Sequence, residues 1–567
     1  MRNRPRHALV AGFGAAVVIA GSVLLPTAAA ERRPAAAQIE APVPELDWAA
    51  CGAQQCAEAE VPLDYDEPDG ATTTIAMTKF PATDAAGKVG TLFLNLGGPG
   101  AKAVGDPTFA LSVRSLGPEV RAKFDIVGID PRGVGGSTPV TCAPAPGQEP
   151  VARPATMIPE TPAEVKAQLA FDDYLRASCD KTAGPILDHM SIADVARDMD
   201  LVRQAVGDEK LTYYGLSYGS LLGQTYAGLF PDRVRALALD GVVDPVASTT
   251  GREGDDRPVG VRMGRPEAME RALATVLAHC DKAGILRCPL AGKAMQRWQR
   301  VHDSLAEKPL ALGPLTIDGR SFRGLYTVNA FQVDHMGGYP IPTIELLAAA
   351  TKLIEVLRFG ISDPAAGPGQ LKVPGQSAID LSAPRSVLEE RLAGLLTEIR
   401  KAASDRAPQP APAPADEDVA AGQAGMFGAL CTDSVNPGDP AAWAQAAEDT
   451  KAKAPRFGPL MVWVFSPCAG WPGSSADAYR GPFGTSLDTP PLIIGNSLDA
   501  ATPIGGAHAA KDLLPGSRLV TLDAWGHTAI GKSGCVTKHV ESYLLRQQLP
   551  GGDQRCATDY TLFGLRN

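Results

Sequence analysis

The chain has 567 residues, of which 45% are hydrophobic and 20% are charged, as in an ordinary globular protein. This length allows two or more domains, or one domain enlarged by an insertion. The formal net charge of -10 argues against a nucleic-acid-binding protein, which needs a basic face, but leaves cationic ligands open.

Residues 1–30 have the pattern of a secretory signal peptide. Arg2, Arg4 and Arg6 precede an apolar run, and small residues follow it up to Ala30. The run is rich in Ala and Gly and would be a weak membrane span, which favours cleavage near Ala30 over an uncleaved anchor. Residues 31–45 are Ala/Pro-rich and predict a tether. The sequence therefore predicts a secreted or cell-wall-associated protein without stable membrane association after cleavage.

All ten cysteines lie beyond the signal, and an even number in an exported chain is typical of disulfides. No C-x-x-C unit or close Cys/His cluster favours zinc. Connectivity cannot be deduced from sequence alone, but proximity along the chain suggests a set of five pairs: Cys51–Cys56, Cys142–Cys179, Cys280–Cys288, Cys431–Cys468 and Cys535–Cys556.

The first part of the chain alternates strand and helix patterns. Residues 59–61 and 72–80 predict edge strands, and residues 91–95 and 124–129 are apolar runs that each end in a glycine-rich loop. Neither loop has the spacing of a dinucleotide fingerprint or a P-loop. A helix over 191–206 precedes another apolar run at 211–214. The pattern predicts an α/β fold with a mostly parallel sheet and helices on both faces.

The segment LTYYGLSYGSLLGQTYAGLF, residues 211–230, passes from a strand pattern through Gly-Leu-Ser-Tyr-Gly into a helix pattern. Strand, sharp turn and helix with Ser217 at the apex is the G-x-S-x-G nucleophile elbow of α/β-hydrolases. A glycine-bearing turn can match this pentapeptide by chance, so the assignment depends on the rest of the chain.

After a predicted strand at 234–239, the pattern changes from alternating strands and helices to mainly helices. Helix patterns at 266–283, 342–359 and 386–402, with a Pro/Ala-rich loop at 407–415, predict a mainly helical cap over residues 245–488, inserted into a hydrolase core of residues 46–244 and 489–567. An independent domain is the alternative. The sheet pattern resumes with strands at 491–495 and 518–522, and helices at 505–514 and 535–547 complete the chain.

A serine nucleophile needs a general base and a group that orients the base. His527 follows a late strand in a glycine-containing loop and is the histidine best placed to reach Ser217. The acid should lie between serine and histidine in the chain, which favours Asp499. Asp240 and Asp244, after the strand that follows the elbow, are the alternatives, and Asp523 is less favoured because it ends the same strand as His527.

The developing oxyanion needs fixed hydrogen-bond donors. One is the backbone N–H of Tyr218, directly after the nucleophile. The second should come from the glycine loop after the first core strand, with Gly98 favoured and Gly97 second. No metal or organic cofactor is implied.

Several motifs together resemble the secreted tripeptidyl aminopeptidase family of actinobacteria, within the prolyl-aminopeptidase-like α/β-hydrolases. They are GGPG at 97–100, DPRGVGGS at 130–137, GLSYGS at 215–220, SPCAGWP at 466–472, GHT at 526–528 and the final cysteine-bearing helix. The resemblance covers most of the chain beyond the signal.

The resemblance implies a triad of Ser217, Asp499 and His527 that releases di- or tripeptides from free N-termini. Such an enzyme needs carboxylates that meet the substrate ammonium, and Asp433 is one candidate in the cap. An esterase or lipase on the same scaffold is the alternative activity, because fold and triad do not choose the acyl substrate. A catalytically silent binding protein is disfavoured by the intact Ser, Asp, His order.

Overall fold

The computed structural model describes residues 41–154, 156, 158–332, 343–360, 369–404 and 417–565. The expected signal at 1–30, the first ten residues of the tether and the Pro/Ala-rich loop at 407–415 lie outside the described residues. Within the described part of the chain, no helix is long and apolar enough to cross a membrane.

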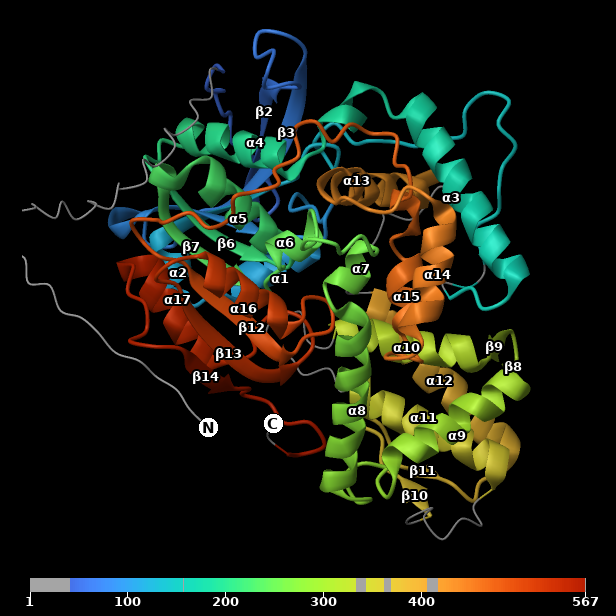
Figure 1. Cartoon of the computed structure of the whole chain (residues 1–567). Helices are drawn as coiled ribbons and strands as arrows, with labels where there is room; N and C mark the ends of the chain where they lie inside the picture. Colours follow the sequence, from blue (N-terminus) through green and yellow to red (C-terminus); the bar gives the residue numbers. More distant parts are fainter. Residues whose placement is uncertain are drawn as a thin grey trace, which may run out of the picture. The chain divides into compact units, whose positions relative to one another are not determined.

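A ten-stranded sheet forms the centre of the fold, in the order β1-β2-β3-β5-β4-β6-β7-β12-β13-β14 (Figure 1). From β5 to β14 all neighbouring strands pair in parallel, whereas β1, β2 and β3 add an antiparallel edge. The strands are β1 (Ala49–Cys51), β2 (Gln54–Pro62), β3 (Thr72–Phe80), β4 (Gly90–Asn95), β5 (Phe124–Ile129), β6 (Leu211–Leu216), β7 (Val234–Asp240), β12 (Leu492–Leu498), β13 (Arg518–Trp525) and β14 (Gln554–Ala557).

Both faces of this sheet are covered by helices, which explains why its central strands are continuous apolar runs. Alternate residues of one strand enter different hydrophobic clusters: Tyr213 packs in one, and Tyr214 in the other. The Tyr213 face is covered by α4 (Ile192–Ala205), α5 (Tyr218–Leu229) and α16 (Ile504–Leu513). The other face is covered by α1 (Pro107–Ser115), α2 (Pro118–Lys123) and α17 (Gly534–Arg546). The predicted α/β-hydrolase fold is confirmed.

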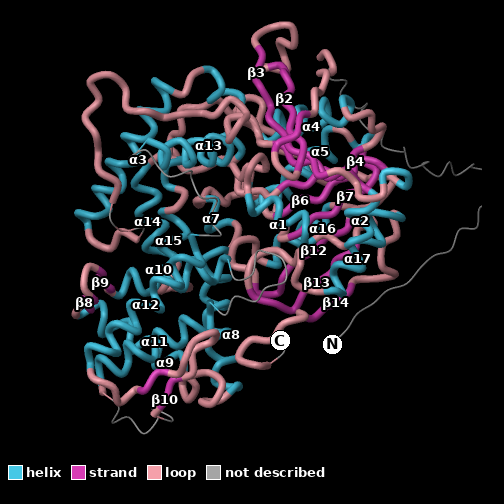
Figure 2. The backbone as a smooth tube through the Cα atoms, turned by 180° about the vertical axis from the view of Figure 1, so that it is seen from behind, coloured by secondary structure: helices cyan, strands magenta, loops and turns pink. Residues whose placement is uncertain are grey.

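Between β7 and β12 the chain is mainly helical, and Figure 2 shows these helices grouped beside the sheet. The helices expected at 266–283, 342–359 and 386–402 are present as α8, α11 and α12. The described helices of this segment are α6 (Pro245–Ser248), α7 (Val259–Arg262), α8 (Arg265–Ala283), α9 (Ala294–Glu307), α10 (Gly319–Gln332), α11 (Thr343–Phe359), α12 (Arg385–Ser404), α13 (Glu417–Asp433), α14 (Pro440–Thr450) and α15 (Gly458–Trp463).

Two short hairpins accompany these helices, β8 (Leu310–Leu312) with β9 (Leu315–Ile317) and β10 (Gln370–Leu371) with β11 (Ile379–Asp380). The helical layer also takes in a segment from before the elbow. Helix α3 (Pro162–Thr182) packs with the one-turn helix η5 (Ser466–Cys468), and Leu175 shares a buried cluster with Phe427 and Trp463.

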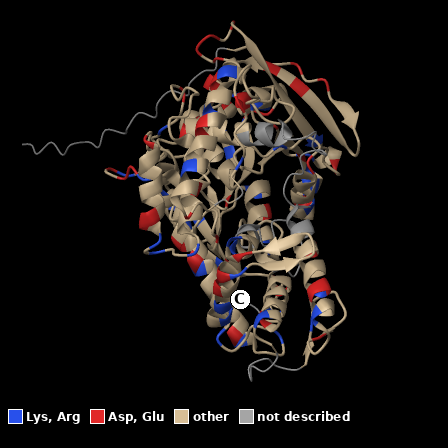
Figure 3. Ribbon diagram, turned by 90° about the vertical axis from the view of Figure 1, so that its right-hand side faces the viewer, with Lys and Arg blue, Asp and Glu red and all other residues tan. Residues whose placement is uncertain are grey.

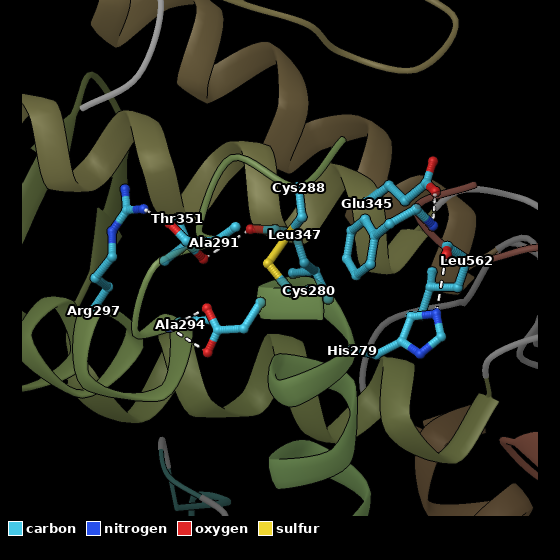
Figure 4. Close-up of a disulfide and its surroundings, with 12 residues drawn as sticks. His279, Cys280, Cys288, Ala291, Ala294, Arg297, Glu345, Leu347, Thr351 and Leu562 are labelled. Carbon is cyan, nitrogen blue, oxygen red and sulfur yellow. Dashed lines mark hydrogen bonds between the residues drawn. A yellow bond between two sulfur atoms is a disulfide. The ribbon is translucent and has the colours of Figure 1, made fainter. Parts of the chain in front are cut away.

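All five suggested disulfides are present: Cys51–Cys56, Cys142–Cys179, Cys280–Cys288, Cys431–Cys468 and Cys535–Cys556. Figure 4 shows Cys280, near the end of α8, bonded to Cys288 in the loop that follows. The next helix begins nearby, where Arg297 donates to the carbonyl of Ala291 at 2.9 Å. This bridge therefore fixes the turn between α8 and α9.

Candidate active site

The elbow has the geometry that its sequence predicts. Strand β6 ends at Leu216, Ser217 adopts φ 59° and ψ -123°, and α5 begins at Tyr218. A positive φ is rare for a serine and marks a backbone held under strain by its surroundings. Glycine is needed on both sides: a Cβ at Gly215 would lie 2.3 Å from the carbonyl oxygen of Gly219, and a Cβ at Gly219 would lie 2.6 Å from Oδ1 of Asn95.

His527 lies in the loop after β13 and shares a buried hydrogen bond with Asp499 from the loop after β12. The His527 Nδ1 to Asp499 Oδ2 distance is 2.8 Å. The Cε1 atom of this imidazole would be 3.1 Å from a Cβ at Gly241, and the preceding Asp240 carbonyl accepts the Ser217 N–H at 2.9 Å. Ser217 and His527 thus each lie beside the carboxyl end of β7, next to Asp240 and Gly241 respectively.

The Asp499 carboxylate is held by more than His527. One oxygen accepts the backbone N–H groups of Ala501 and Thr502 at 2.8 and 2.9 Å, and the other accepts the Thr502 hydroxyl at 2.9 Å. Burial alone would raise the pKa of Asp499, but the positive charge of His527 and these hydrogen bonds outweigh it and lower the pKa below its usual value. The site therefore holds an ionised carboxylate on the Nδ1 side of His527.

The three other acids considered for this position have different partners. Asp240 accepts the backbone N–H groups of Ala529 and Ile530, and burial raises its pKa to about 6. Asp244 caps α6 by accepting the Val246 and Ala247 N–H groups. Asp523 pairs with Arg555 on β14. Asp499 is thus the acid that is hydrogen-bonded to His527.

The glycine loop after β4 lies directly against the elbow. A Cβ at Gly97 would fall 2.4 Å from the Leu216 carbonyl oxygen and 2.6 Å from the Tyr218 nitrogen. The Gly97 N–H already donates to the Asn95 side chain at 2.9 Å. Gly98 also has a positive φ, of 103°, and no recorded hydrogen bond among the described residues uses its N–H. This arrangement favours Gly98 over Gly97 as the partner of Tyr218 in binding an oxyanion.

The helical segment contacts both glycine loops through α13. The backbone of Met426 would be 3.2 Å from a Cβ at Gly100, and a Cβ at Gly425 would be 3.1 Å from the Gly133 carbonyl oxygen. Asp130 ties the loops together, because it accepts the Ala103 N–H at 2.6 Å and the Gly136 N–H at 2.9 Å. Close packing of backbone on backbone explains why these positions are glycine.

Asp433, at the end of α13, is buried, and both of its carboxylate oxygens accept hydrogen bonds. Its carboxylate accepts the Tyr218 hydroxyl at 2.5 Å and the Ile192 N–H at 2.9 Å. Burial raises the pKa of Asp433 to about 7, against the lowering effect of these hydrogen bonds. The suggested ammonium contact is not supported, since this carboxylate faces Tyr218 and the start of α4 rather than open space. Asp433 instead ties the helical segment to the residue after the nucleophile.

Two clusters bring possible metal ligands within 4.8 Å of one another in the described residues. One consists of Cys535, His539 and Cys556, but its cysteines form a disulfide. The other consists of Asp64, His189 and Asp477, and none of these belongs to the elbow, the 97–100 loop or the His527–Asp499 pair.

Comparison with known proteins agrees with this architecture. A family model described as alpha/beta hydrolase fold matches residues 91–278, and a model described as TAP-like protein matches residues 454–556. Tripeptidyl aminopeptidase from Streptomyces lividans is 28% identical over 534 residues, which cover 91% of this chain and 87% of that protein.

Two mycobacterial relatives extend the comparison. Serine protease Hip1 from Mycobacterium tuberculosis is 34% identical over 280 residues, which cover 46% of this chain and 50% of that protein. Carboxylesterase B from the same organism is 29% identical over 586 residues, which cover 98% and 99% of the two chains. The chain is therefore a serine hydrolase of the α/β-hydrolase fold, related over most of its length to the tripeptidyl aminopeptidases.

Proposed function

We propose that the protein is a secreted serine exopeptidase that releases di- or tripeptides from free N-termini. The observation that supports the proposal is that Ser217, the buried His527–Asp499 pair and the 97–100 loop all follow the carboxyl ends of parallel strands, at one edge of the sheet. Similarity to the Streptomyces tripeptidyl aminopeptidases supports peptides as the acyl substrates. The five disulfides and the signal-like N-terminus support export.

In the proposed mechanism, Ser217 Oγ attacks the scissile carbonyl while His527 accepts its proton. Asp499 holds His527 in the required tautomer and stabilises the imidazolium. The N–H groups of Tyr218 and Gly98 bind the oxyanion. His527 then gives the proton to the leaving amine, and water hydrolyses the acyl-enzyme by the same steps.

The test uses fluorogenic aminoacyl-peptide substrates with free and with blocked amino termini, followed by mass spectrometry of the products. We expect hydrolysis of the free form and little of the blocked form; equal turnover of both would remove the aminopeptidase assignment. In Ser217→Ala, kcat should fall by several orders of magnitude, on the order of 10⁴-fold or more. Unchanged hydrolysis by that variant would overturn the mechanism.

Carboxylic ester hydrolysis is the second candidate function, because Carboxylesterase B aligns with 98% of the chain. The same triad and oxyanion donors would act on an ester carbonyl. Hydrolysis of simple acyl esters with much higher kcat/KM than any free N-terminal peptide would favour it.

A further inference from the structure

Three side chains from distant parts of the chain come together beside the antiparallel edge of the sheet. Asp64 lies in the loop between β2 and β3, His189 ends the short 3-10 helix η2 (Pro185–His189), and Asp477 lies in the chain before β12. One donor atom of each lies within 4.8 Å of the donor atoms of the other two. All three residues are partly buried. This group of one imidazole and two carboxylates is called the edge cluster below.

The His189 ring nitrogen that faces the edge cluster has no hydrogen-bond partner among the described residues. This atom, Nδ1, is buried, and it lies 3.8 Å from Asp477 Oδ2. That distance is too long for a hydrogen bond, which extends to about 3.2 Å. Two atoms that each bind one ion at about 2.1 Å lie roughly 3 to 4 Å apart. The separation therefore fits two ligands of the same metal ion better than a direct hydrogen bond.

One buried ion pair fixes the backbone that carries the first two residues of the edge cluster. Arg132 donates to the Leu63 carbonyl at 2.8 Å and to the His189 carbonyl at 3.2 Å. The Arg132 side chain is paired with Asp198, and the two are 0% and 2% exposed. Asp198 also accepts the Tyr65 hydroxyl at 2.8 Å. Leu63 and Tyr65 flank the first aspartate, so two of the three side chains start from a fixed backbone, which lowers the entropic cost of binding an ion.

The chain that carries the third residue is attached to η2 by separate contacts. The Ser474 N–H donates to the Asp188 side chain at 2.7 Å. A Cβ at Gly473 would lie 2.6 Å from the Leu187 carbonyl oxygen, so the two backbones are in close contact there. Asp477 follows three residues after Ser474. The three segments are thus held together by contacts that do not involve the side chains of the edge cluster.

The charges around the edge cluster favour a cation. Arg132 and Arg197 both lie near the Tyr65 ring, but they are paired with Asp198 and Asp194. Two carboxylates and one imidazole therefore form a site with an excess of negative charge. An imidazole nitrogen favours zinc and other transition metals, whereas calcium and magnesium prefer ligand sets made of oxygen atoms.

We propose that Asp64, His189 and Asp477 bind one divalent transition-metal ion, for which zinc is the best match, with water completing its coordination. The ion joins the loop between β2 and β3, the end of η2 and the chain that returns from the helical segment to β12. Its role is structural, because an ion that binds only the folded chain stabilises that chain by mass action. This site goes beyond the proposed exopeptidase function and does not depend on it.

Binding is tested by isothermal titration calorimetry on the oxidised, untagged protein after removal of metal with EDTA. Zinc chloride is the probe, and calcium and magnesium chlorides are the comparison. We expect one zinc ion per chain, and binding of calcium and magnesium that is weaker by about 100-fold or more. Zinc at about 100 times its dissociation constant should raise the melting temperature by about 2–3 °C.

The variants H189N, D64N and D477N locate the ion. Each should weaken zinc binding by about 100-fold or more, since even the residues that only support metal ligands are worth about 10- to 100-fold in affinity. H539N is the matched control, because His539 belongs to the other group of possible ligands, whose two cysteines form a disulfide. It should bind zinc as wild type does and show the same rise in melting temperature.

Wild-type zinc affinity in H189N, or an equal loss of affinity in H539N, would overturn the proposal. So would zinc binding no tighter than calcium binding. A wild-type crystal soaked with zinc and measured at the zinc absorption edge gives a result that does not depend on a folded variant. We expect an anomalous peak between Asp64, His189 and Asp477. A peak only at His527, or no peak at all, would leave the edge cluster as an ordinary group of charged side chains and refute the metal site.

Discussion

At Asp499, an amide in place of the carboxylate tests how far His527 depends on it. Asp499→Asn keeps the shape of the side chain but presents an N–H₂ or a neutral oxygen to His527 Nδ1, which no longer favours the required tautomer. We expect kcat to fall by roughly 10⁴-fold. The change in the free energy of unfolding should be much smaller than the corresponding rise in the activation free energy. Steady-state kinetics and thermal unfolding measure the two effects.

Asp244→Asn is the matched control, since Asp244 is one of the three other acids considered for this position and caps α6. It should retain near wild-type kcat and lose at most about 1 kcal/mol of stability. A larger loss of kcat in Asp244→Asn than in Asp499→Asn would reverse the assignment of the acid.

Asp433 makes a pH-dependent contribution to stability. Its folded pKa of about 7 lies above that of an unfolded aspartate, about 3.9. The folded chain therefore binds this proton more tightly, and the contribution is lost as pH rises from about 4 to about 7. Tyr218, Arg480 and Asp194 are the charged or titratable groups that act on Asp433.

We expect Asp433→Asn to flatten the fall in thermal stability between pH 5 and pH 7.5 relative to wild type. Asp172 and Asp240 also have pKa values raised to about 6, so part of the wild-type slope should remain in the variant. An unchanged slope in Asp433→Asn would contradict the prediction.

Among single residues, the sequence predicts catalytic roles for Ser217, Asp499 and His527 because each follows a strand pattern, and these roles stay predictions. The parts played by Asn95 and Thr502 cannot be predicted from the sequence. The Thr502 hydroxyl donates a hydrogen bond to Asp499, and the Asn95 side chain accepts one from the Gly97 N–H. Polar residues at strand ends are common, and only the folded geometry brings these two to the site. The sequence marks Asp433 only by its charge and does not show that the side chain is buried, so its hydrogen bond with Tyr218 cannot be predicted.

At the scale of elements, the contact between the 97–100 loop and the elbow can be tested by one methyl group. Gly97→Ala would place a Cβ 2.4 Å from the Leu216 carbonyl oxygen and 2.6 Å from the Tyr218 nitrogen. The loop must then move away from the elbow, which separates the two oxyanion donors. We expect kcat/KM to fall by about 10²- to 10³-fold, the usual cost of losing one such donor.

Gly105→Ala is its control, because Gly105 also has a positive φ, of 67°, but no atom lies within 4 Å of a Cβ there. It should show backbone strain, on the order of 1 kcal/mol, with kcat/KM close to wild type. Similar kinetic losses in both variants would show that strain alone, and not loop displacement, accounts for the effect.

The strands and helices predicted from the sequence are present where a buried face gives the apolar residues a regular spacing. The strands that became β4 to β7, β12 and β13 are apolar runs, and β6 is buried at every residue. Strand β14, with the sequence QRCA, cannot be predicted because it is short and polar and pairs only with β13 among the described strands. Helix α3 cannot be predicted from apolar spacing because only four of its 21 residues are buried.

For the whole molecule, two disulfides with the same sequence separation allow a comparison of stability with function. Cys142–Cys179 and Cys431–Cys468 each span 37 residues, so the chain-entropy model assigns each about 4 kcal/mol. Cys431 lies two residues before Asp433 on α13, the helix that contacts the 97–100 loop.

We expect replacement of either pair by serine to lower the melting temperature by a similar amount. Only loss of Cys431–Cys468 should also lower kcat/KM at temperatures well below unfolding, because α13 then moves against the elbow. The measurements are differential scanning calorimetry and steady-state kinetics on both double variants. Equal kinetic losses in the two variants would contradict this role of α13.

At the scale of the whole molecule, the distribution of charged residues does not indicate where a ligand binds. Figure 3 shows acidic and basic residues interspersed over the helices, so the net charge of -10 is not gathered into one field that could steer a ligand. The net charge argues against a nucleic-acid partner but does not show where single charges lie.

The last described residues have a consequence for how substrates enter. After β14 the chain returns to the helical segment, where Phe563 donates its N–H to Glu345 on α11 at 2.7 Å and Leu562 meets His279 on α8. The helical segment is thus joined to the sheet through the chain after β7, through the chain before β12 and through this C-terminal return. A segment attached to the sheet at three places cannot move as a unit about a single hinge. We expect the width of a polypeptide to decide whether it enters the site. An extended, unfolded chain end should enter, and a folded domain should not.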